Sequence, residues 1–121
     1  MNKDVKHILI VDDNEDICEV VTLILVKAGY DAHAVGHFEP FSNGNTPDLI
    51  LLDIKMGAQD GREVCRNLKS HKETHDIPVI IFSASPDVKD QAEKAGADDF
   101  ISKPFEIKEL LGKIEHLSQA A

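Results

Sequence analysis

Acidic, hydroxyl and amino side chains stand at the ends of four short apolar runs in this sequence. These side chains are Asp12 with Asp13, then Asp53, Ser83 and Lys103. Short apolar runs are typical of strands that a parallel sheet buries on both faces. Because the functional groups of an open α/β sheet gather at the carboxyl ends of its strands, we expect these side chains to meet at one edge.

Three neighbouring carboxylates repel one another, by about 4 kcal/mol for a pair 4 Å apart at an effective dielectric constant near 20. Such a cluster needs a cation or must take up protons. Asp12, Asp13 and Asp53 offer oxygen ligands without histidine or cysteine, which suits Mg²⁺ that retains several waters. An alternative is that Asp12 and Asp13 favour the dipole of the following helix. Asp53 ends a buried run and has no such local duty.

Magnesium beside a carboxylate indicates phosphoryl transfer, because the metal can bridge a nucleophilic oxygen and the incoming group. In this interpretation Asp53 is the nucleophile and forms an acyl phosphate. The Lys103 ammonium group pairs with a phosphoryl oxygen, and the Ser83 hydroxyl donates to another. Taken singly, Lys103 could be a solvated surface cation and Ser83 a turn residue. Their joint placement at strand ends favours the functional interpretation.

Strands and helices are expected to alternate along the chain. The apolar patterns predict strands at residues 7–11, 30–35, 48–53, 77–83 and 99–102. This alternation predicts a parallel sheet with right-handed crossovers and helices on both of its faces.

Capping residues mark the expected helices. Asn14 is a suitable N-cap for the first helix, which Gly29 ends. Asp60 or Gly61 opens a second helix. The remaining signals are Ser85-Pro86 and Gly96, at the start and end of a third helix, and a final helix over residues 106–117 with Ile107, Leu110, Leu111, Ile114 and Leu117 on one face. Within residues 36–47, Pro40 limits any helix to one or two turns.

The composition narrows the classes of partner and compartment. The 22 acidic and 13 basic residues give a formal charge of −9, which argues against direct binding to nucleic acid or to an anionic membrane. No apolar run approaches the roughly 18 residues of a membrane span, and the N-terminus lacks a signal-peptide pattern. Cys18 and Cys65 lack metal-ligand spacing and are interpreted as buried or half-buried thiols. We therefore expect a cytoplasmic protein.

Four strings in order carry a family resemblance: ILIVDDNED, PDLILLDIKM, IPVIIFSAS and AGADDFISKPF. With DG at 60–61 and the final helix they cover essentially the whole chain, and the combination is highly specific. The sequence resembles the receiver domain of two-component response regulators, the group that includes the single-domain chemotaxis regulator. This resemblance implies one receiver domain over residues 1–121. Its fold would be a five-stranded parallel sheet of flavodoxin-like order 2-1-3-4-5.

The resemblance also implies a function. A sensor histidine kinase or histidine phosphotransfer protein donates a phosphoryl group to Asp53 in a Mg²⁺-dependent reaction. The domain then switches conformation to signal to a downstream protein. It catalyses its own phosphorylation and dephosphorylation and does not turn over an external substrate.

By the same resemblance, Asp13 is a direct Mg²⁺ ligand and Asp12 acts on the metal largely through water. Lys55 supplies a backbone carbonyl, so its side chain is not implicated. Ser83 swings toward the phosphoryl group. The remaining counterparts are Lys103 as the lysine of the family motif, with a cis bond to Pro104, and Phe100 as the aromatic switch whose ring turns inward.

The sequence also departs from the family pattern. Gly57 stands where such domains usually have proline after Met56, which predicts a more mobile loop behind Asp53. The region with Pro40 and Gly44 is shorter than usual. Ala84 is small and should leave the site open to donors.

Three alternatives stay open at this point. The domain could serve as a phosphate shuttle or sink in a phosphorelay. A flavin-binding electron-transfer domain would share the topology, but the acidic residues 12–16 would repel a flavin phosphate. A phosphate-metabolising enzyme with an aspartyl nucleophile would carry a second acid two residues later, where this chain has Lys55.

Overall fold

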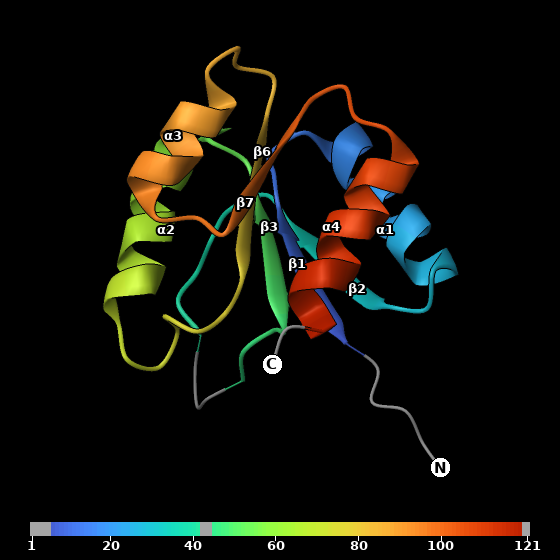
Figure 1. Ribbon diagram of the computed structural model, residues 1–121, viewed down its shortest axis with the longest axis horizontal. Coiled ribbons are helices and arrows are strands. Elements are labelled where there is room, and N and C mark those ends of the chain that lie inside the picture. The colour runs from blue at the N-terminus through green and yellow to red at the C-terminus, as the bar shows by residue number, and fades with distance from the viewer. Residues whose placement is uncertain (1–5, 42–44, 120–121) are drawn as a thin grey trace.

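A five-stranded parallel sheet forms the centre of the protein, shown in Figure 1 as a computed structural model that describes residues 6–41 and 45–119. Its strands are β1 (His7–Val11), β2 (Asp31–Val35), β3 (Leu49–Leu52), β6 (Val79–Ser83) and β7 (Asp99–Ser102). They lie in the order β2-β1-β3-β6-β7, and a separate antiparallel pair is formed by β4 (Lys55–Met56) and β5 (Gln59–Asp60). With that pair set aside, the observed order confirms the expected 2-1-3-4-5.

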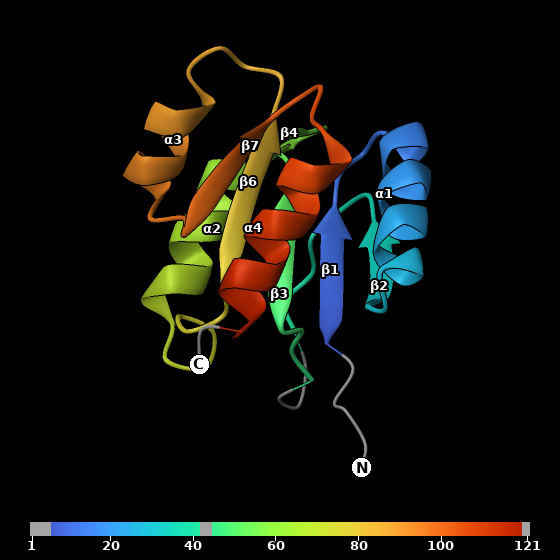
Figure 2. The same ribbon diagram turned by 45° about the vertical axis from the view of Figure 1, so that its right-hand side comes forward.

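Helices cover both faces of the sheet, as the alternating pattern predicts. They are α1 (Glu15–Lys27), α2 (Gly61–Ser70), α3 (Val88–Ala95) and α4 (Ile107–Gln119). Helices α1 and α4 cover one face and α2 and α3 the other (Figures 1 and 2). Each face buries its own apolar cluster, and every residue of β3 and β6 is buried.

Most of the predicted helix ends are confirmed. The Asn14 side chain caps α1 by accepting a hydrogen bond from the Ile17 N–H at 3.1 Å. Gly29 and Gly96 follow α1 and α3 with φ of 100° and 82°, conformations that favour glycine. The cysteine prediction also holds, because Cys18 is half-buried and Cys65 is buried.

The predicted start of α3 is wrong. The helix begins at Val88, and Asp87 rather than Ser85 occupies the N-cap position. Residues 85–88 instead form a turn, in which the Ser85 carbonyl oxygen accepts from the Val88 N–H at 3.3 Å. Residues 85–87 therefore belong to the loop that follows the β6 strand end.

The prediction for the final helix needs a smaller correction. Leu110 and Ile114 are fully buried, and Leu111 and Leu117 are partly buried against the same core. Ile107, the first residue of α4, is 54% exposed, so the buried face of the helix begins at Leu110.

The connection between β2 and β3 contains no helix in its described parts, residues 36–41 and 45–48, which agrees with the limit that Pro40 sets on any helix there. Gly44 lies outside the described residues. The Gln59 side-chain amide holds this connection instead. It accepts from the Phe38 N–H at 2.8 Å and donates to the Phe38 carbonyl oxygen at 2.9 Å.

Gly57 shapes the segment behind Asp53. Met56 pairs with Gln59 across a tight turn made by Gly57 and Ala58, and the expected mobility of this loop stays a prediction. Gly57 has a φ of 61°, which suits a two-residue hairpin. Proline is fixed near −65° and could not adopt it. Glycine at this position therefore allows a tight hairpin turn that proline could not form.

Candidate functional site

Sheet register brings the predicted carboxylates together. Val11 of β1 is the partner of Leu52 in β3, so the next residues, Asp12 and Asp53, lie side by side. The Asp53 N–H also donates to the Val11 carbonyl oxygen at 2.9 Å. Asp12, Asp13 and Asp53 each offer an oxygen, and these oxygens lie within 4.8 Å of one another. The predicted cluster is therefore present at the carboxyl edge of the sheet.

The carboxylates differ in burial. Asp12 is 1% exposed and Asp53 is 8% exposed, whereas Asp13 is open to solvent. Both Asp12 oxygens have partners: one accepts from the Asn14 N–H at 2.9 Å, and the other from the Lys103 ammonium group at 2.7 Å. Asp12 thus holds the start of α1 and the lysine in place together.

Lys103 reaches the cluster from the end of β7. Its Nζ lies 2.7 Å from Asp12 Oδ2 and 3.5 Å from Asp53 Oδ1, so one ammonium group serves two buried carboxylates. The ammonium group also lies 4.6 Å from the centre of the Phe82 ring. The Lys103 N–H donates to the Ser83 carbonyl oxygen at 2.9 Å, and the bond to Pro104 is cis, as the resemblance implied.

Burial raises the pKa of Asp53 to about 6. The positive charge of Lys103 opposes this shift, while the negative charge of Asp12 adds to it. A hydrogen bond from the Ile54 N–H to Asp53 Oδ1, at 2.9 Å, favours the ionised form. Asp53 is therefore mostly ionised at neutral pH, and a further cation would stabilise the charged form.

Ser83 ends β6 at the same edge and is buried. Its hydroxyl oxygen accepts a hydrogen bond from the Ser85 N–H at 3.1 Å, and the hydroxyl still has its own hydrogen to donate. Ser83 is in register with Ser102 of β7, the residue before Lys103. The hydroxyl and the ammonium group therefore come from neighbouring strand ends.

The donor set fits a magnesium ion. It consists of carboxylate oxygens alone, which suit a hard cation, and the exposed Asp13 leaves room for retained waters. Lys103 offsets part of the negative charge but not all of it. Lys55 is the first residue of β4 and its side chain is exposed, in keeping with a role limited to its main chain, which stays a prediction.

Phe100 lies apart from the carboxylate cluster, on the edge strand β7. Its ring is half-buried, and the Lys113 ammonium group lies 4.5 Å from the ring centre. Lys113 also lies 3.2 Å from Asp99 Oδ1. The proposed switch residue is thus tied to α4 rather than to the carboxylates.

Gly61 is a site residue whose role the sequence reasoning missed. A Cβ atom at this position would collide with the Asp53 carbonyl oxygen. The Gly61 N–H also donates to the Ile54 carbonyl oxygen at 2.6 Å. The Asp60-Gly61 pair was interpreted as a helix start, which it is, but the glycine also allows α2 to approach the residue behind the cluster.

The sequence model of the response regulator receiver domain matches residues 8–115. The chain belongs to this family. The receiver prediction is therefore confirmed, and the flavin alternative is not favoured.

Full-length relatives agree with this assignment. The receiver domain is 40% identical to the phosphate regulon transcriptional regulatory protein PhoB of Pseudomonas aeruginosa, over 91% of the chain and 50% of PhoB. It is 36% identical to the DNA-binding dual master transcriptional regulator RpaA of Synechocystis, over 92% of the chain and 48% of RpaA. The chain thus spans about half the length of these curated relatives.

A solved structure supports the same fold. The signal receiver domain of a signal transduction histidine kinase from Syntrophus aciditrophicus is 31% identical with a TM-score of 0.83, covering 97% of this chain and 92% of that one. Among the described residues, no helix has the length and apolar character needed to cross a bilayer.

Proposed function

We propose that this receiver domain accepts a phosphoryl group on Asp53 from a histidine kinase or a histidine phosphotransfer protein. The observation that carries the proposal is the Lys103 ammonium group, which lies between the buried carboxylates of Asp12 and Asp53. A structural ion pair would need one carboxylate, whereas this cluster has three and keeps a net negative charge. That arrangement suits the binding of a metal and a phosphoryl group.

The transfer step uses the ionised form of Asp53. One carboxylate oxygen attacks the phosphorus atom of the donor's phosphohistidine, an oxygen–phosphorus bond forms, and the phosphorus–nitrogen bond breaks. The electron pair of the broken bond stays on the imidazole nitrogen. Lys103 pairs with a phosphoryl oxygen that the transfer brings into the site, and the Ser83 hydroxyl donates to another.

Asp12, Asp13, Asp53 and the backbone carbonyl of Lys55 would hold Mg²⁺. When bound, the ion neutralises charge on the carboxylates and on the phosphoryl oxygens. Asp12 also keeps Lys103 in position through the 2.7 Å ion pair. Loss of Asp12 would therefore remove a metal-side acid and misplace the lysine at the same time.

The phosphorylated state would be read by a downstream protein in the cytoplasm. Movement of Ser83 toward the phosphoryl group would open space next to β7, and the Phe100 ring would turn inward. The contact between Phe100 and Lys113 would then change, which alters the surface formed by β7 and α4. No nucleic acid or membrane is needed for this step.

An intact-mass measurement tests the proposal. The full chain is incubated with MgCl₂ and acetyl phosphate, and we expect a gain of one phosphoryl group that is absent in Asp53→Asn. Asp76→Asn is a matched control, because the Asp76 side chain is highly exposed in the loop between α2 and β6, at the opposite end of β6 from Ser83. This variant should gain the phosphoryl group normally. A gain that persists in Asp53→Asn would contradict the assignment.

A further inference from the structure

In its described parts, residues 36–41 and 45–48, the connection between β2 and β3 places no helix over the sheet. Parallel crossovers usually carry a helix over one face, and α1, α2 and α3 occupy the other three crossovers of this sheet. The described residues of the β2–β3 connection contain none. Leu9 and Val35, which belong to the face covered by α2 and α3, are therefore only partly buried.

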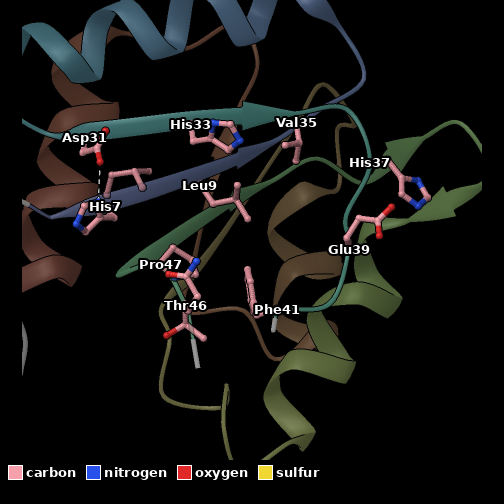
Figure 3. A pocket seen from close by; sticks show the side chains of 12 residues that line it. His7, Leu9, Asp31, His33, Val35, His37, Glu39, Phe41, Thr46 and Pro47 are labelled. Atoms are coloured by element: carbon pink, nitrogen blue, oxygen red, sulfur yellow. Dashed lines mark hydrogen bonds and ion pairs between the residues drawn. The ribbon is translucent and has the colours of Figure 1, made fainter. Parts of the chain in front are cut away.

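Two adjoining hollows lie along this strip. The first, of about 370 Å³, lies over β1 and β2 and includes Leu9, Val35 and Phe41 in its lining. The second, of about 740 Å³, lies between the connection and α2. Phe41 and Thr46 line both. Figure 3 shows the first hollow, where the Leu9 and Phe41 side chains point toward one another.

The wall between the hollows is already in place. Phe38 and Phe41 pack edge to face with ring centres 5.4 Å apart, and the two Gln59 hydrogen bonds fix the Phe38 backbone. Val64 and Leu68 of α2 complete the apolar lining of the second hollow. A partner would therefore meet a surface whose ordering cost is largely met before binding.

The charge of the lining favours a basic partner. Among the described residues that line the two hollows, Asp31, Glu39 and Glu73 are acidic, none is lysine or arginine, and four are histidines, which add no charge when neutral. His7 lies 2.7 Å from Asp31 and pairs with it when protonated. Arg66 of α2 is exposed but lines neither hollow. The formal charge of −9 on the whole chain attracts cations to this surface as well.

We propose that the two hollows form one docking groove for a basic amphipathic helix of a partner protein. Aliphatic side chains of that helix would occupy the hollows on either side of Phe41. Its lysine or arginine side chains would lie against Glu39 and Glu73. A helix is the expected occupant because the groove lies where a crossover helix would otherwise cover the sheet, and amphipathic helices bind such grooves through regularly spaced apolar anchors.

Binding of designed peptides to the full chain tests the groove. The probe is a synthetic peptide of about 18 residues with leucine at i, i+3, i+4 and i+7 and lysine elsewhere. Its counterpart carries glutamate in place of lysine. We expect the lysine peptide to bind at least about tenfold more tightly by fluorescence anisotropy, and to shift the amide resonances of Leu9, Val35 and Phe41.

Groove variants localise the effect. The double variant Glu39→Gln, Glu73→Gln should weaken the lysine peptide by about three- to tenfold, whereas the matched double variant Glu19→Gln, Glu93→Gln on α1 and α3 should change it by less than about twofold. Phe41→Ala should weaken binding of the lysine peptide by about tenfold, because it removes the side chain that lines both hollows. If Phe41→Ala does not fold, the two double glutamate variants still test the groove.

Any of the following results would overturn the proposal: equal binding of the two peptides, an equal loss in the control double variant, or resonance shifts confined to α1 or the carboxylate edge. Concentration-dependent self-association that Phe41→Ala abolishes would assign the groove to a second copy of the chain, which also overturns it. Asp53→Asn should bind the peptide as the parent does. The groove proposal can therefore be wrong while the phosphoacceptor assignment is correct, and the phosphoacceptor assignment can be wrong while the groove proposal is correct.

Discussion

The carboxylate edge and the docking groove depart from ordinary packing in opposite ways. At the edge, the charged side chains of Asp12 and Asp53 are buried. In the groove, the apolar side chains of Leu9 and Phe41 are left partly exposed. Each departure raises the free energy of the isolated domain and can be offset by a ligand of the complementary kind. The edge suits a cation with a phosphoryl group, and the groove suits an apolar surface.

Removing the Lys103 ammonium group should have the largest effect on the carboxylate edge while leaving peptide binding in the groove unchanged. Lys103→Met keeps an unbranched apolar side chain but leaves Asp12 and Asp53 without their shared cation. We expect the free energy of unfolding to fall by about 3 kcal/mol in urea titrations without metal, because removing one partner of a buried ion pair leaves uncompensated charge. Labelling by acetyl phosphate should be lost, while the lysine peptide should bind the groove as before.

Lys113→Met is the matched control for this change. Lys113 also pairs with carboxylates, those of Asp99 and Glu109, and also lies over an aromatic ring, but its partners are much less buried than Asp12. The expected loss is therefore below about 1 kcal/mol. Equal losses of unfolding free energy in the two lysine variants would show that burial of Asp12 and Asp53 does not make the Lys103 ion pairs more important for stability than the less buried ion pairs of Lys113.

The pH dependence of stability should give the second largest effect, and it depends on Asp53 at the carboxylate edge. The Asp53 pKa is about 6 in the folded protein and 3.8 in the reference state, so between these values the folded state holds more protons. The free energy of unfolding should therefore fall as the pH rises from about 4 to about 6. Above about pH 6 it stays lowered by the full cost of ionising the buried Asp53 carboxyl. Asp53→Asn removes this cost and should raise the free energy of unfolding near neutral pH by on the order of 1–3 kcal/mol.

Chemical unfolding at a series of pH values, without metal, checks this sign. The stability of Asp53→Asn and of the parent should converge as the pH falls to about 4, and added MgCl₂ should narrow the difference near neutral pH by stabilising the parent. Parallel curves for the two proteins across this range would mean that burial does not shift the pKa of Asp53.

The same two regions show how far the sequence could predict this protein. Strand ends at the edge are fixed by apolar runs and by register, so the meeting of Asp12, Asp53 and Lys103 followed from the pattern alone. The path of the β2–β3 connection depends on hydrogen bonds between Gln59 and Phe38, 21 positions apart. No local periodicity encodes such a contact. The start of α3 was misplaced because the Ser85 carbonyl oxygen closes a turn with the Val88 N–H, so the first helical residue is Val88 rather than Pro86.

Gln59 joins the two regions and gives the smallest expected effect. It lies in β5, the second strand of the hairpin that leaves the Asp53 loop, and it holds the Phe38 backbone at the wall of the groove. Gln59→Ala removes both hydrogen bonds and should lower the free energy of unfolding by about 1 kcal/mol. Hydrogen exchange at the Phe38 amide should accelerate by about fivefold or more, because its acceptor is lost.

Peptide binding and phosphoryl labelling of Gln59→Ala show whether the Gln59 hairpin supports the groove or the carboxylate edge. If the hairpin fixes the groove, Gln59→Ala should weaken the lysine peptide by about two- to fivefold, since the Phe38–Phe41 wall must then be ordered on binding. The extent of labelling at Asp53 should stay within about twofold of the parent, because the Lys103 ion pairs do not involve Gln59. A large loss of labelling with unchanged peptide binding would reverse the assignment and make the hairpin a support of the carboxylate edge instead.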